Sequence, residues 1–264
     1  MDRTDVLGRA LRTLDADRGE LDVRYNAFDE VVWMRDAEGT ETHVVYDGLG
    51  RMTSRTDGTD PPALWQWDTA PHGAGLLDFA ASPDGHVLSY EYDMHGRLTS
   101  EQDDVGSIER SYDPATGLLT RIAYPEVGGR RFTVEYVYRG GYLALIRDVT
   151  DGTDVRVLWA ADERHPDGRL RRERTGGGAT LTREYDDLTG RMNRFELVSS
   201  NGTVLADTVS TYRPNGELLT RNDSHLRRDE TFEHDTLGRL SSWSFVTPSG
   251  AGTREYEYDD AGNL

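Results

Sequence analysis

The sequence has no cysteine, no lysine and no long apolar run. The absence of cysteine excludes disulfide bridges and thiolate metal sites. All 30 basic residues are arginine, and 48 acidic residues give a formal net charge of −18. Because nucleic-acid phosphates require a basic surface, we expect no nucleic-acid partner. No segment has the length and apolarity of a membrane span, and residues 1–17 lack the apolar region of a signal peptide.

One short phrase returns along the chain at intervals of 20 to 27 residues. It begins with an aromatic residue and an aspartate, reaches a glycine about four residues later, and continues with arginine. Clear copies begin at Tyr46, Tyr92, Tyr112, Tyr185, His234 and Tyr258, and looser copies at Thr4, Tyr25, Trp67, Tyr138, Arg164 and Tyr212. A period in this range is typical of repeat architectures.

Each copy predicts a β-hairpin. Apolar residues alternate before the aromatic residue, as in Phe132, Val134 and Tyr136, which indicates a strand with one buried face. The aspartate can accept a backbone N–H in the turn, and the glycine tolerates a positive φ. The predicted structural turn residues are Tyr46, Asp47, Gly50, Arg51, Tyr92, Asp93, Gly96, Arg97, Tyr112, Asp113, Gly117, Tyr185, Asp186, Gly190, Arg191, Asp235, Gly238, Arg239, Tyr258, Asp259 and Gly262.

Two details of the turns are also predicted. The turns that follow Tyr112 and Tyr185 gain one residue, so we expect a longer loop or a bulge there. The arginines after the glycine could pair with an aspartate of the neighbouring copy or cover an aromatic face. Together the copies predict an all-β array of hairpins over residues 1–264, with about twelve units, a degenerate first unit and a last unit cut short.

A catalytic constellation is missing from the sequence. The 7 histidines form no HExxH motif, and neither a GxSxG motif nor a dinucleotide-binding fingerprint is present. We therefore expect no catalytic residue, no metal and no cofactor, and a protein that is not an enzyme. Because carboxylates are abundant, a glycosidase-type pair stays open as a lesser alternative.

The tryptophans are the candidates for a ligand platform, namely Trp33, Trp65 and Trp243. Trp65 and Trp67 alternate with Gln66, which places their side chains on one face of a strand. We expect these two rings to pack together as a buried anchor, and an exposed ligand platform is the alternative.

The repeated tyrosine–aspartate phrase resembles the Rhs, or YD-repeat, family, and the resemblance covers the chain from about residue 4 to its last residue. The tracts WQWDTAPHGAGLL, YVYRGGYLALIRD and REYDDLTGRMNRFEL resemble its bacterial branch, which includes polymorphic toxins and the shells of insecticidal toxin complexes. The asparagine-rich sequence with which family members release a C-terminal toxin is not found in this chain.

The resemblance implies that the hairpins join into one continuous, spiralling sheet, an open segment of an Rhs shell. It implies a non-enzymatic scaffold whose partners are the rest of the parent chain and an encapsulated C-terminal toxin or effector. Such a protein is secreted or delivered to the cell exterior. Since the copy at Tyr258 supplies a turn and no returning strand, we expect a piece of a longer protein.

Three further expectations accompany this interpretation. Exposed terminal strands would let the chain self-associate edge to edge. A surface or adhesion module that binds a glycan or a protein is the alternative function. A hydrolase is a third and weaker hypothesis, because no motif supports it.

Overall fold

The computed structural model describes residues 3–15, 19–152, 154–259 and 262–263. Every regular element within these ranges is a β-strand, so the predicted all-β array of hairpins is confirmed. Helices of the length and apolarity needed to cross a membrane are not found among the residues described. Contacts divide the chain into two compact units, Met1–Thr133 and Val134–Leu264. A single continuous array of about twelve repeats stays a prediction.

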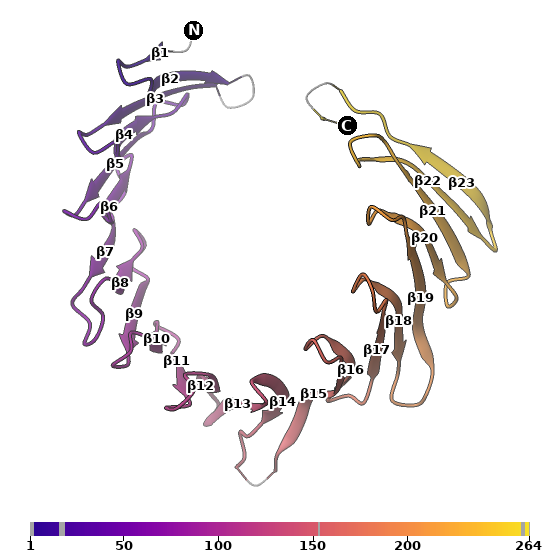
Figure 1. Cartoon of the computed structure of the whole chain (residues 1–264). Coiled ribbons are helices and arrows are strands. Elements are labelled where there is room, and N and C mark those ends of the chain that lie inside the picture. The colour runs from indigo at the N-terminus through magenta and orange to yellow at the C-terminus, as the bar shows by residue number, and fades with distance from the viewer. Residues whose placement is uncertain (1–2, 16–18, 153, 260–261, 264) are drawn as a thin grey trace. The chain divides into compact units, whose positions relative to one another are not determined.

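In the first unit the strands are antiparallel and pair in chain order (Figure 1). Each strand therefore satisfies the backbone of the one before it and the one after it. The strands are β1 (Arg3–Thr4), β2 (Ala10–Asp15), β3 (Gly19–Tyr25), β4 (Val31–Arg35), β5 (Glu41–Tyr46), β6 (Met52–Asp57), β7 (Ala63–Trp67), β8 (Leu77–Ala81), β9 (Val87–Tyr92), β10 (Leu98–Gln102), β11 (Ser107–Tyr112) and β12 (Leu119–Val127).

The second unit has the same topology, with antiparallel pairing between consecutive strands from β13 to β23 (Figure 1). The range of β13 includes the boundary between the units. The strands are β13 (Arg130–Arg139), β14 (Tyr142–Asp148), β15 (Arg156–Arg164), β16 (Leu170–Thr175), β17 (Thr180–Tyr185), β18 (Met192–Val198), β19 (Val204–Tyr212), β20 (Leu218–Asp223), β21 (Arg228–His234), β22 (Leu240–Thr247) and β23 (Gly250–Glu255).

A β-bulge lies beside each repeated turn. Tyr46 pairs with Met52, whereas Val45 pairs with Ser54, so Thr53 is an extra residue on the returning strand. The Thr53 hydroxyl donates to the Val45 carbonyl at 3.2 Å. The same register shift occurs at Tyr25, Tyr46, Trp67, Tyr92, Tyr112, Tyr138, Arg164, Tyr185, Tyr212 and His234.

The sequence predicted a longer loop or a bulge where the turn gains a residue, after Tyr112 and Tyr185, and the longer loop is what forms. The structure holds that extra residue within the turn, where the Asp113 N–H donates to the Leu118 carbonyl at 2.8 Å. The bulge is instead common to short and long turns. Since a bulge increases local twist, every repeat twists its sheet in the same place.

Side chains in these sheets are mostly half-buried. The buried apolar residues of the first unit include Val23, Trp33 and Val44, and Ala160 is buried in the second. Among the residues described, no apolar residue has less than 5% of its surface exposed. Apolar burial is therefore shallow, and the ladder of backbone hydrogen bonds and the polar contacts between repeats carry more of the cohesion.

Candidate functional site: the repeated corner

The repeated turn, which we call the corner, is organised by its aspartate. Asp47 Oδ1 accepts the N–H groups of Leu49 at 2.9 Å and Arg51 at 3.0 Å. Asp47 Oδ2 accepts the Arg51 Nε–H at 2.7 Å. The backbone closes the same turn, because the Gly50 N–H donates to the Asp47 carbonyl at 3.1 Å. The Asp47 side chain thus bonds the residues of the turn from Leu49 to Arg51, as an aspartate at this turn position can.

The other short corners repeat this geometry at Asp93 and Asp235. The Arg97 guanidinium, with help from backbone N–H groups, lowers the pKa of Asp93 to about 2. The Arg51 side chain likewise lowers the pKa of Asp47. At neutral pH these carboxylates are therefore ionised and act as acceptors only.

The two longer corners use threonine instead of arginine. Asp186 Oδ1 accepts the Thr189 N–H at 2.7 Å and the Thr189 hydroxyl at 2.8 Å, and Asp113 bonds Thr116 in the same way. The hydroxyl bonds and backbone N–H groups lower the pKa of both carboxyls. Without a side-chain bond to Asp186, Arg191 is directed toward the next repeat.

Consecutive corners are joined by a contact that we call the seam. We call the first residue of each repeated phrase, such as Tyr46 or Tyr258, the leading residue and the residue after the turn glycine the return residue. The return arginine of one corner lies over the leading aromatic ring of the next, 4.4 to 5.9 Å from its centroid. This contact occurs in the pairs Arg51–Trp67, Arg97–Tyr112, Arg169–Tyr185, Arg191–Tyr212 and Arg239–Tyr258.

The polar end of each leading ring completes the seam. The Tyr185 hydroxyl donates to the Leu170 carbonyl at 2.9 Å, and Leu170 directly follows the return residue Arg169. Each of the five rings makes this bond with the residue after its return arginine. A cation–π contact of this exposure is worth about 0.5–1 kcal/mol and a hydrogen bond about 0.5–1.5 kcal/mol, so each seam is modest and the series matters.

The turn glycine is part of the seam as well. Gly190 has φ +71°, which favours glycine, and a Cβ placed on it would lie 3.0 Å from the Arg169 Nη1. A Cβ on Gly117 would lie 3.2 Å from the Arg97 Nη1. The return arginine of one repeat therefore packs against the turn glycine of the next. The glycine allows the positive φ of the turn and leaves room for that arginine.

The sequence offered two roles for the arginines, and the structure shows both and adds a third. Arg51 bonds Asp68 of the next repeat and lies over Trp67. Arg97 and Arg239 lie over the next aromatic ring. The missed role is the bond from Arg51 to the aspartate of its own corner. The spacing of four residues between aspartate and arginine was the available signal.

The corner at the end of the chain also forms. The Tyr258 hydroxyl donates to the Leu240 carbonyl at 2.9 Å. The Gly262 N–H donates to the Asp259 carbonyl, and Asp259 Oδ1 accepts the Asn263 N–H at 2.8 Å. Every turn residue named from the sequence thus lies at a corner. The architectural role of these turn residues is part of the proposed function.

The three candidate tryptophans differ in their surroundings. Trp33 is buried, with 8% of its surface exposed, and its indole N–H donates to Glu41 at 3.2 Å. The suggestion of an exposed ligand platform at Trp33 is therefore wrong. Trp243 is half-buried against Phe245, at 5.1 Å between ring centroids, and donates to Glu230 at 3.1 Å.

Trp65 and Trp67 lie on one face of β7, as their alternation predicts, and both are half-buried rather than enclosed in a core. Trp67 is held by its seam, under Arg51 and bonded to the Met52 carbonyl at 2.9 Å. Among the residues described, the Trp65 ring has no aromatic or arginine partner. The two rings line a shallow pocket of about 460 Å³ with Asp47, Arg51 and Asp68.

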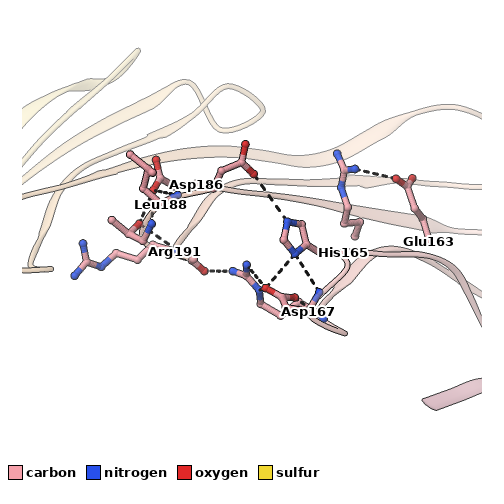
Figure 2. A network of polar contacts seen from close by, with 11 residues as sticks. Glu163, His165, Asp167, Asp186, Leu188 and Arg191 are labelled. Atoms are coloured by element: carbon pink, nitrogen blue, oxygen red, sulfur yellow. Dashed lines mark hydrogen bonds and ion pairs between the residues drawn. The ribbon is translucent and has the colours of Figure 1, made fainter. Parts of the chain in front are cut away.

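A network of polar contacts with several titratable groups lies between two corners (Figure 2). His165 Nδ1 lies 3.0 Å from Asp167 Oδ2, and His165 Nε2 lies 3.9 Å from Asp187 Oδ1 on the next corner (Figure 2). Arg169 donates to Asp167 and to the Gly190 carbonyl, and its guanidinium lowers the pKa of the Asp167 carboxyl. His165 and Arg169 each contact a residue of the next corner, so the network joins two corners.

Within the described ranges, no three histidine or carboxylate side chains are grouped as a metal ion would require. The repeated corners and seams define the class of protein. It is an antiparallel hairpin scaffold whose corners are coupled one to the next by arginine, tyrosine and glycine.

Comparisons with known proteins agree with that class. No protein-family model matches the chain. The double-stranded DNA deaminase toxin A of Burkholderia cenocepacia (strain H111) is 28% identical over 265 residues, which cover 95% of this chain and 17% of the toxin. The structure of the Photorhabdus luminescens Tc holotoxin pore with a mutated TccC3 matches with a TM-score of 0.74 and 18% identity, over 100% of this chain and 15% of that chain.

The crystal structure of TcdB2–TccC3–Cdc42 matches with a TM-score of 0.69 and 14% identity, over 100% of this chain and 17% of that chain. This chain therefore spans about a sixth of the length of these relatives, 15–17%. It shares its fold with these toxin-complex proteins, and the predicted resemblance to the Rhs, or YD-repeat, family is confirmed.

Proposed function

We propose that the chain is a wall segment of an Rhs-type shell that encloses a C-terminal toxin or effector polypeptide until its delivery to the cell exterior. Its mechanism is confinement without catalysis. Paired strands leave few free backbone N–H and C=O groups for a protease or an unfolded cargo to engage. The turn and aromatic residues of the corners have an architectural role, and the partners are the rest of the parent chain and its cargo.

The serial coupling of corners carries this proposal. The seam recurs in both units, from Arg51 and Trp67 in the first to Arg239 and Tyr258 in the second, so cohesion is spread over several joints instead of one core. Likeness in fold to toxin-complex proteins supports the same role. The deaminase activity named for the Burkholderia relative is not proposed for this chain, which covers 17% of that toxin.

Limited proteolysis of the whole product of the gene that encodes this chain tests the proposal. Thermolysin and mass spectrometry should find a C-terminal segment that resists cleavage while the array is intact. Gly96→Val combined with Gly190→Val should expose that segment, because both glycines have positive φ. The matched control is Gly48→Val, at a glycine without positive φ. Equal cleavage of all three proteins would refute enclosure.

A second candidate function is binding of a glycan, and the pocket beside Trp65 favours it. A half-exposed indole offers a flat apolar face for a sugar ring, and Gln66, Asp47 and Asp68 are polar groups that could orient hydroxyls. A glycan array read by tryptophan fluorescence tests this function. A hit that Trp65→Ala abolishes and Trp243→Ala leaves unchanged would support it. A blank array, or a hit that Trp65→Ala retains, would reject this pocket.

A further inference from the structure

One seam of the second unit has its two residue types in reverse order. The corner between β13 and β14 turns through Gly140 and Gly141, and its return residue is Tyr142 where the ordinary seams have arginine. The leading residue of the next corner is Arg164, the last residue of β15, where the ordinary seams have an aromatic residue. The residue type at either position alone therefore suggests that the contact between these two corners is lost.

The geometry shows that the contact is kept. The Arg164 guanidinium carbon lies 5.1 Å from the centroid of the Tyr142 ring, within the range of the ordinary seams. The carbonyl that follows the return residue is also satisfied, because Arg164 Nη2 donates to the Leu143 carbonyl at 2.5 Å. In the ordinary seam the Tyr185 hydroxyl makes the equivalent bond with Leu170. Arg164 thus performs both tasks of a leading tyrosine.

The turn glycine provides an independent observation. A Cβ on Gly168 would lie 2.5 Å from the Tyr142 hydroxyl oxygen, just as a Cβ on Gly190 would lie 3.0 Å from Arg169 Nη1. Tyr142 therefore occupies the place of a return arginine against the next glycine. Arg164 Nη1 also donates to the Gly168 carbonyl at 2.9 Å, which fixes the guanidinium on the same corner.

We infer that Tyr142 and Arg164 are a seam with exchanged partners, and that the constraint on this position acts on the pair and not on either residue. An arginine facing an arginine would place two like charges together, and a tyrosine facing a tyrosine would lose the cation. The inference concerns how neighbouring repeats recognise one another, and it does not depend on whether the sheet encloses a cargo.

A cycle of four proteins tests the inference: the wild type, Tyr142→Arg, Arg164→Tyr and the double exchange Tyr142→Arg/Arg164→Tyr. We expect each single variant to lower the Tm of the second unit by about 3–6 °C, from the loss of a cation–π contact and a hydrogen bond. The double exchange rebuilds the ordinary order of arginine and tyrosine, so it should recover at least half of that loss.

Hydrogen exchange supplies a local readout, because a repeat array can unfold in parts. Amides of β14 and β15 should exchange faster in each single variant and return toward wild-type rates in the double exchange. The matched control is Tyr142→Arg/Arg156→Tyr, in which Arg156 stands on the same strand but away from the corner; it should recover nothing. Additive losses in the double exchange, or recovery by the control, would overturn the inference.

Discussion

The sharpest prediction concerns Gly96, whose φ of +74° lies in the left-handed region. A Cβ on Gly96 would meet only Leu76 Cδ1, at an ordinary van der Waals distance of 3.7 Å. Substitutions at this glycine therefore test backbone strain almost without steric interference. An L-residue in the left-handed conformation costs about 1–2 kcal/mol, and a β-branched residue resists it most.

The expected order of stability is Gly96, then Gly96→Asn, then Gly96→Ala, then Gly96→Val. Asparagine tolerates the left-handed region and should lose least. Valine should lower the free energy of unfolding by more than about 1 kcal/mol, which corresponds to a Tm lower by roughly 2–4 °C per kcal/mol for a chain of this size. Circular dichroism melts and hydrogen exchange of β9 and β10 measure the effect.

Gly48 offers a control within a corner of the same type. It has no positive φ, and a Cβ there would meet no atom within 4 Å. Gly48→Ala should leave the Tm unchanged or raise it slightly, since the substitution restricts the unfolded chain. If Gly96→Val melts with the wild type, or if Gly48→Ala destabilises as much as Gly96→Ala, the assignment of strain to the corner glycine is refuted.

Three further outcomes are expected. Tyr185→Phe should lose about 0.5–1.5 kcal/mol with the hydrogen bond to Leu170, whereas Tyr90→Phe, on β9 two residues before the leading residue Tyr92, removes no seam bond and should be nearly neutral in urea unfolding; equal losses would show that the seam hydrogen bond does not stabilise the fold. The folded pKa of Asp93, about 2, lies below its unfolded value of about 3.9, so the unfolded state binds more protons between these values. Stability should hold above about pH 4 and fall toward pH 2, and urea midpoints of the wild type and Asp93→Asn should converge as pH falls; parallel curves would contradict this. Edge pairing through β23 should give concentration-dependent sedimentation that strengthens when salt screens the net charge of −18; strict monomers at high concentration and high salt would argue against pairing-competent edges.

Much of the fold could be read from the sequence because each repeat encodes its own turn. The spacing of Tyr46, Asp47 and Gly50 specifies a strand end, a turn acceptor and a left-handed residue within five positions. Such local rules do not depend on distant contacts. They located every corner, including those with poor copies such as the one at Arg164.

The seams were harder to predict because they join residues 14 to 22 positions apart, and no local rule links a return residue to the next leading residue. Trp33 shows the same limit. The sequence suggested an exposed platform at Trp33, whereas the Arg24 and Arg35 guanidinium groups lie over its ring and its indole N–H donates to Glu41. The bulges were also hidden, since a threonine such as Thr53 fits a regular strand equally well.

The exchanged seam has a consequence for how this sequence can change over time. Repeats that have a leading tyrosine and a return arginine are interchangeable. Duplication or deletion of a whole hairpin of this kind still leaves an arginine next to a tyrosine. The repeat whose return residue is Tyr142 and the repeat whose leading residue is Arg164 are not compatible with those ordinary repeats. Recombination that separates Tyr142 from Arg164 would place each residue beside a partner of the wrong type. The two repeats must therefore stay adjacent, whereas the other repeats can be exchanged.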